Sequence, residues 1–257
     1  MSELLKTSSE IKDWLRKIGI KNKFSLSVDL VISVKGDVLL TKASVVDGKL
    51  PVRFGMVVGN FDCGSCKLTC LDGCPSYITG NFNCDRNYLT SLVGCTKEIG
   101  GSFSCVKNQL TDLVGCPNRV TNNFLCNDNE LLSLLGVPAK IDGDFDCSGN
   151  QLTSLEGGPV EVGRNYCCNL NKLTSLSCGD VKVGSQFDCC NNKLQSLEGC
   201  PLEASLIYYA DNCLEIEDGL SFVQIKAYVE NKRVSDLLHE KLDEEKIISN
   251  MVKKSKI

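Results

Sequence analysis

Cysteine is the residue type with the widest chemical potential in this chain, because a thiolate can attack a substrate, bind a metal ion or form a disulfide. The 257 residues include 17 cysteines but only one histidine, His239. Four of the cysteines fall within the segment CGSCKLTCLDGC, where they could form a zinc site: Cys63, Cys66, Cys70 and Cys74. A cysteine-dependent or metal-dependent enzyme is therefore one hypothesis for the chain.

The spacing of the cysteines favours a structural role instead. Seven of them recur every 21 residues: Cys63, Cys84, Cys105, Cys126, Cys147, Cys168 and Cys189. Each lies two residues after an aromatic residue, and the aromatic row continues to Tyr208: Phe61, Phe82, Phe103, Phe124, Phe145, Tyr166, Phe187 and Tyr208. Residues two apart in a strand point to the same side, so we expect both rows to face the interior. We predict reduced, buried thiols, with Cys167 and Cys190 on the outer side.

No motif for catalysis accompanies these thiols. The chain lacks a phosphate-binding glycine loop and an HExxH motif, and His239 lies in a charged segment without a cysteine–acid neighbour. We therefore expect no enzymatic activity, no metal and no cofactor, and keep the enzyme hypothesis as a minor alternative.

Three further rows follow the same period and predict stacked turns. Asparagines recur from Asn87 to Asn192, and two leucine rows run from Leu68 to Leu194 and from Leu71 to Leu197. We expect the leucines to fill the interior and each asparagine amide to bond the backbone of the next turn. One turn cannot bury its own apolar face, whereas a stack of turns can.

The pattern x-x-Phe-x-Cys-x-x-Asn-x-Leu-x-x-Leu resembles the leucine-rich repeat, and NxLTSLxGCP resembles its short bacterial type. The resemblance covers roughly residues 57–219. It implies a solenoid with a curved parallel β-sheet on the concave side and extended returns on the convex side. It also implies a bacterial or phage origin, but it says almost nothing about activity because the fold hosts many functions. Similar effectors carry a ubiquitin-ligase domain, for which the roughly 37 residues after the repeats are too few.

The rows divide the chain into four segments. Residues 1–22 are expected to form an N-terminal helical cap, with Thr7 and Glu10 in a capping box. Residues 23–56 are expected to form a β-hairpin, centred on VKGDV, and a degenerate first repeat. Residues 57–219 hold the regular repeats, and residues 220–257 form a C-terminal helical cap or, alternatively, a helix that docks on a partner.

Composition limits the partners and the compartment. The net charge is −4, no apolar run is long enough to span a bilayer, and the N-terminus lacks a signal-peptide core. We expect a cytoplasmic protein in a reducing compartment, with delivery into a host cell as the alternative. Neither nucleic acid nor membrane is an expected partner.

The partner-binding surface is expected on the outer side of the strands. Positions one before, one after and three after each aromatic hold six aspartates and no lysine or arginine. The candidate partner-binding residues are Asp62, Asn83, Asp85, Leu125, Asn127, Asp144, Asp146, Asn165, Asn169, Asp188 and Tyr209. We expect these aspartates to contribute little to folding.

Two hypotheses account for this polar face. It could bind a protein or a basic or polar peptide segment, so that the chain occludes or scaffolds a partner, including as a host-directed bacterial effector. Alternatively, short polar side chains simply solvate the sheet. The sequence identifies neither the partner nor the oligomeric state.

Overall fold

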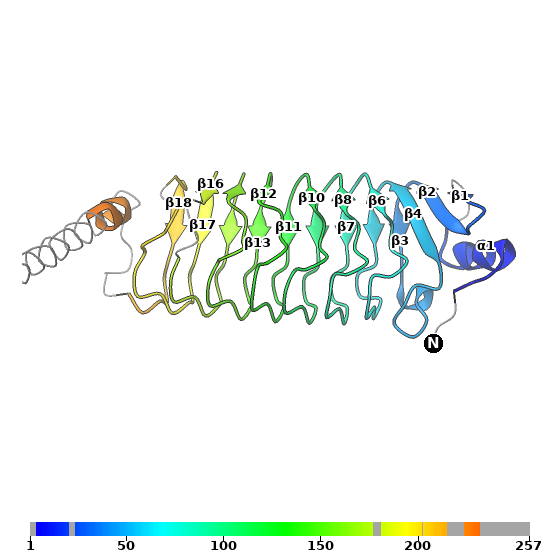
Figure 1. Cartoon of the computed structure of the whole chain (residues 1–257), viewed down its shortest axis with the longest axis horizontal. Helices are drawn as coiled ribbons and strands as arrows, with labels where there is room; N and C mark the ends of the chain where they lie inside the picture. Colours follow the sequence, from blue (N-terminus) through cyan, green and yellow to red (C-terminus); the bar gives the residue numbers. More distant parts are fainter. Residues whose placement is uncertain (1–3, 21–23, 177–180, 202, 215–223, 232–257) are drawn as a thin grey trace, which may run out of the picture.

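The computed structural model shows a parallel β-solenoid whose turns stack along the long axis of the molecule (Figure 1). It describes residues 4–20, 24–176, 181–201, 203–214 and 224–231. In Figure 1 the turns form a nearly straight row, so we distinguish the two sides by their sheets and not by curvature.

One side of the solenoid is a nine-stranded parallel sheet built from the aromatic-x-Cys segments. Phe61 pairs with Phe82, and Phe82 pairs with Phe103, so equivalent residues lie side by side. The strands are β3 (Val38–Leu39), β5 (Phe61–Asp62), β7 (Phe82–Asn83), β9 (Phe103–Ser104), β11 (Phe124–Leu125), β13 (Phe145–Asp146), β15 (Tyr166–Cys167), β17 (Gln186–Asp188) and β18 (Leu206–Tyr208).

The return segments also form strands, which corrects the expectation of merely extended returns. A six-stranded sheet contains β1 (Phe24–Leu26), β2 (Val31–Lys35), β4 (Arg53–Val58), β6 (Tyr77–Ile78), β8 (Glu98–Ile99) and β10 (Arg119–Val120). A three-stranded sheet contains β12 (Lys140–Ile141), β14 (Glu161–Val162) and β16 (Lys182–Val183). Each short strand buries one branched apolar residue, such as Ile78 or Ile99, between the two sides.

A continuous ladder of aromatic rings fills the space between the sides. Neighbouring ring centroids are 5.0 to 5.9 Å apart, and the rings are tilted or edge-on, an arrangement that their quadrupoles favour. The ladder consists of Phe54, Phe61, Phe82, Phe103, Phe124, Phe145, Tyr166 and Phe187. The predicted leucine rows are also buried.

A ladder of buried asparagine amides fastens each turn to its neighbour. The Nδ2 atom of Asn108 donates to the carbonyl oxygens of Cys84 (3.1 Å) and Cys105 (3.0 Å), and its Oδ1 atom accepts from the Leu89 N–H (3.1 Å). The residue before it, Lys107, has a left-handed backbone (φ 56°) that turns the chain out of the strand. Bonding to a neighbouring turn was predicted, but the amide reaches the preceding turn and not the next one.

The N-terminal helix α1 (Ser8–Lys17) covers the first turn. Thr7 and Glu10 form the predicted capping box, and Ile11 and Leu15 are buried in the common core. Trp14 packs near Phe54 with ring centroids 6.2 Å apart.

The hairpin differs from the expectation, and most of the expected C-terminal cap lies outside the described residues. The antiparallel pair is β1 with β2, and the short 3-10 helix η1 (Lys42–Ser44) follows β3. VKGDV is not a hairpin turn, because it connects β2 to β3 in the other sheet. Residues 224–231 are helical, but the rest of 220–257 lies outside the described residues, so the C-terminal cap remains a prediction.

Candidate functional site

The cysteine row is a structural ladder. Every cysteine in the described part of the chain is free, and the seven predicted ladder members are buried. Each thiol lies near a carbonyl oxygen of the next turn, as for Cys84 Sγ and Ser104 O at 3.2 Å. Burial raises the pKa of the Cys84 thiol well above its ordinary value, and the same cause acts on Cys105 and Cys126. Because only a thiolate is a good nucleophile, these residues are not poised for reaction.

The more accessible thiols are also held in their protonated form. Cys167 and Cys190 are half-buried, as predicted for the outer members of the cysteine pairs. Loss of hydration, followed by the neighbouring aspartates, raises the pKa of Cys167 to about 12. Loss of hydration and Asp188 raise the pKa of Cys190 to about 11. Within the described ranges, no three His, Cys, Asp or Glu side chains are grouped to hold a metal ion.

The outer surface of the nine-stranded sheet, here called the Asp face, carries ten of the eleven predicted partner-binding residues. All ten are half-buried: Asp62, Asn83, Asp85, Leu125, Asn127, Asp144, Asp146, Asn165, Asn169 and Asp188. Their neighbours across the sheet are equivalent residues of adjacent turns, for example Leu125 beside Asp146.

Tyr209 is the exception, and its predicted position is wrong. The last turn has 20 residues, so Ile207 and not Tyr208 pairs with Phe187. Tyr209 therefore takes the place of the inward cysteine and is only 6% exposed. Tyr208 points outward in its stead, and Asn212 closes the asparagine ladder by accepting from the Leu194 N–H.

On the Asp face, the side chains one position before each aromatic residue bond one turn to the next. The Oδ1 atom of Asn123 accepts from the Asp144 N–H (2.9 Å), and the Oδ1 atom of Asp144 accepts from the Asn165 N–H (3.1 Å). Asn60 and Asn81 make the same contact earlier in the stack. These short side chains satisfy backbone groups at the start of each strand, which have no other partner in the ladder.

The aspartates one position after an aromatic close turns at the strand ends, whereas Asp85, three positions after Phe82, bonds the next turn. The Oδ1 atom of Asp146 accepts from the N–H (2.9 Å) and the hydroxyl (2.6 Å) of Ser148. Asp62 accepts from the Gly64 N–H (2.8 Å), and Asp85 accepts from the Val106 N–H (2.8 Å). Asp62, Asp85, Asp144, Asp146 and Asp188 each accept a backbone hydrogen bond, a structural role that was not predicted from the sequence.

Charge is distributed unevenly along the Asp face. At its N-terminal end, Arg86 and Lys107 line a hollow of about 410 Å³ together with Asp62 and Asp85. Lys107 also lies 3.9 Å from a carboxylate oxygen of Asp128. Cations thus accompany the carboxylates in this half.

The C-terminal half of the Asp face contains three carboxylates, Asp144, Asp146 and Asp188. We call these three residues the acidic patch. None of the three forms an ion pair with a residue that the structure describes. Burial raises the pKa of Asp146, the hydrogen bonds from Ser148 oppose this rise, and the charges of Asp128 and Asp188 add to it. The acidic patch therefore holds a negative potential that the described residues leave uncompensated.

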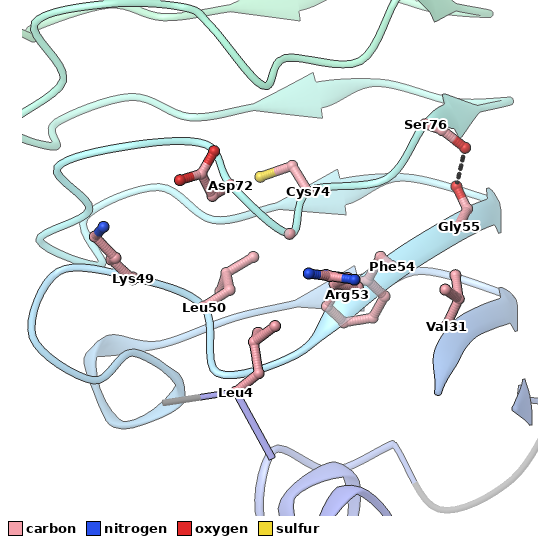
Figure 2. Close-up of a pocket in the computed structure, with 11 residues that line it drawn as sticks. Leu4, Val31, Lys49, Leu50, Arg53, Phe54, Gly55, Asp72, Cys74 and Ser76 are labelled. Atoms are coloured by element: carbon pink, nitrogen blue, oxygen red, sulfur yellow. Dashed lines mark hydrogen bonds between the residues drawn. The ribbon is translucent and has the colours of Figure 1, made fainter. Parts of the chain in front are cut away.

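A second hollow lies where the N-terminal segment at Leu4 meets the first turns (Figure 2). This cap pocket has a volume of about 580 Å³. It is lined by Leu4, Val31, Lys49, Leu50, Arg53, Phe54, Gly55, Asp72, Gly73, Cys74 and Ser76. This pocket was not predicted from the sequence. A signal was present, because Arg53 stands 21 residues before Cys74 and so replaces the buried cysteine of later repeats.

Comparison with family models, with curated proteins and with solved structures gave no match for this chain. No helix in the described ranges combines the length and the apolar character needed to cross a membrane.

Proposed function

We propose that the chain is a protein-binding module of the leucine-rich-repeat type, of bacterial or phage origin, that occludes or scaffolds a partner protein. The observation that supports this proposal is the acidic patch, whose three carboxylates have no ion-pair partner in the described part of the chain. The partner would present a basic or polar segment to the Asp face.

The geometry of the acidic patch favours this use. Asp144 and Asp146 are held by backbone hydrogen bonds on either side of β13, and Asp188 is held in the same way at the end of β17. Side chains that are already ordered lose little entropy when a partner binds. A negative surface of fixed shape also attracts basic segments from solution and orients them. Nucleic acid is a poor candidate for this face, because phosphate contacts require lysine or arginine.

A capture experiment tests the proposal with charge-neutral substitutions. The variant Asp144→Asn with Asp146→Asn keeps both side-chain acceptors and removes two charges from the acidic patch. The matched control, Asp112→Asn with Glu156→Gln, removes two charges outside the Asp face. We expect wild type and control to retain the same partner from lysate at low salt, and the patch variant to lose it.

Equal retention of that partner by all three proteins would reject the acidic patch as the binding surface. Intact mass and thermal unfolding of each bait establish that the comparison is between folded proteins.

A further inference from the structure

We propose that the cap pocket binds a small organic monocarboxylate with an apolar body. This site is separate from the Asp face, and the proposal does not depend on protein binding there.

The pocket arises from the irregular first repeat. Later repeats bury a cysteine at the position that Arg53 occupies: Cys74, Cys95, Cys116 and Cys200. Arg53 is exposed, so the space that a small thiol would close remains open above Leu50 and Phe54. At Gly73 (φ 87°), an added Cβ would clash with the Val52 carbonyl oxygen, so this wall is bare backbone.

The pocket offers an apolar floor of suitable size. Leu50 and Phe54 are each 4% exposed, and Leu4 and Val31 complete the apolar lining. The volume of about 580 Å³ lies within the range of about 300–1,000 Å³ that small-molecule sites usually have. An aromatic or branched aliphatic body would displace water from these side chains, which favours binding.

Two cations supply the recognition of an anion. Arg53 and Lys49 both line the pocket, and Figure 2 shows the Lys49 ammonium at its edge, apart from the Arg53 guanidinium. Neither forms an ion pair with an acidic residue in the described ranges. A guanidinium matches a carboxylate with two parallel hydrogen bonds, which gives it both strength and orientation.

Asp72 limits the charge of the ligand. It lines the same pocket as Lys49 and Arg53 and is exposed there. With two cations and one carboxylate, the net charge of the lining is about +1. A ligand with one negative charge is therefore favoured over a dianion such as a phosphate monoester.

The chain has a built-in reporter for this site. Its only tryptophan, Trp14, lies with its ring centroid 6.2 Å from that of Phe54, which lines the pocket. A ligand that packs on Phe54 is expected to change the emission of Trp14.

The test is a titration of the full chain with 3-phenylpropanoate, followed by Trp14 emission and by ligand-observed NMR. The neutral 3-phenylpropanamide and the dianionic 2-phenylethyl phosphate serve as matched probes. We expect saturable binding of the carboxylate, and binding of the amide and the phosphate weaker by about tenfold or more. No saturable binding, or equal binding of carboxylate and amide, would overturn the proposal.

Substitutions place the binding in the cap pocket. Arg53→Gln is expected to weaken the binding of 3-phenylpropanoate by about tenfold or more, because it removes the guanidinium that would hold the carboxylate. Arg119→Gln, an exposed arginine of β10 on the same sheet, should leave the affinity unchanged. Equal loss in both variants, or no loss in Arg53→Gln, would contradict the assignment. The Asp144→Asn and Asp146→Asn variant should bind the probe as wild type does, which separates this site from the Asp face.

Discussion

At the scale of single residues, the buried asparagines hold the turns together more directly than any other polar side chain. Each bonds two carbonyl groups on adjacent turns and one backbone N–H, as Asn108 does with Cys84, Cys105 and Leu89. None of these backbone groups can reach water once the stack is closed. A buried polar group without a partner costs about 1–3 kcal/mol.

We predict that Asn108→Ala lowers the free energy of unfolding by about 1–3 kcal/mol, because the buried Leu89 N–H loses its partner. The carbonyl oxygens of Cys84 and Cys105 each keep one amide donor, from Asn87 and Asn129. Chemical denaturation measures this change. Gln109→Ala, at the exposed neighbouring position, is the matched control and should change the stability by less than about 0.5 kcal/mol. A loss below about 1 kcal/mol in Asn108→Ala would show that water or a rearranged backbone replaces the amide.

The thiols give a second prediction at this scale. The exposed Cys213 should react first with iodoacetamide in the native protein. The half-buried Cys70, Cys167 and Cys190 should react more slowly, because burial raises the pKa of each thiol. The buried ladder members Cys84, Cys105 and Cys126 should react only after unfolding, because burial both blocks access and raises their pKa. Mass mapping after limited labelling checks this order. Early labelling of Cys105 or Cys126 would contradict the register of the strands.

At the scale of elements, the polar ends of the strands combine structure with charge. Asp146 accepts a hydrogen bond from the backbone N–H of Ser148. Its charged form is disfavoured by partial burial and by the nearby charges of Asp128 and Asp188, which raise its pKa. Its pKa is raised above 3.8, so the folded state binds the proton more tightly than the unfolded state does. The contribution of Asp146 to stability therefore falls as the pH rises from about 3.8 through the pKa of the folded state.

We predict that Asp146→Asn is as stable as wild type at pH 7, or more stable by up to about 1 kcal/mol, because the amide keeps the Oδ1 acceptor and removes the charge. Unfolding measured between pH 3.5 and pH 7 should also show a smaller loss of stability with rising pH than in wild type. Asp146→Ala should instead be destabilised, since it removes the acceptor. If Asp146→Asn were clearly less stable than wild type at pH 7, the charge itself would be stabilising.

The sequence predicted some elements and missed others for physical reasons. The strands of the nine-stranded sheet from β5 to β17 were predicted because an inward aromatic and an inward cysteine recur in each turn. The two-residue strands on the return side were missed because each buries a single residue, such as Ile78 or Val120, and two residues show no alternation. The last turn was misaligned because Tyr208 and Tyr209 are both aromatic, although Asn212 lies 20 residues after Asn192 and carries the correct spacing.

The candidate site was also predicted only in part from the sequence. Ten of the eleven residues proposed for binding lie on the Asp face, because strand register alone determines which side a residue occupies. Their hydrogen bonds were not predicted, since these depend on the distance between turns. The cap pocket was missed because it results from a departure from the repeat at Arg53.

At the scale of the whole molecule, stability depends on covering the ends of the stack. Helix α1 buries Ile11 and Leu15 against the first turn. We predict that removal of residues 1–22 exposes this apolar end and leads to aggregation or a lower melting temperature. Size-exclusion chromatography and thermal unfolding measure both effects. A truncated protein that stayed monomeric and equally stable would show that α1 is not a cap.

The C-terminal segment poses the corresponding question at the other end. We predict that removal of residues 221–257 also causes aggregation or a lower melting temperature, as expected for a cap. If the shortened protein were stable and monomeric but no longer bound its partner, the segment would be a docking element.

We propose that the acidic patch draws a basic partner to the Asp face. The most direct test is the association rate of the captured partner, measured for wild type and for Asp144→Asn with Asp146→Asn across a range of salt concentrations. We predict that the variant associates more slowly at low salt and that the difference disappears as the Debye length falls to about 3 Å near 1 M salt. Equal association rates at low salt, with both proteins folded, would contradict the claim and place the binding surface elsewhere on the solenoid.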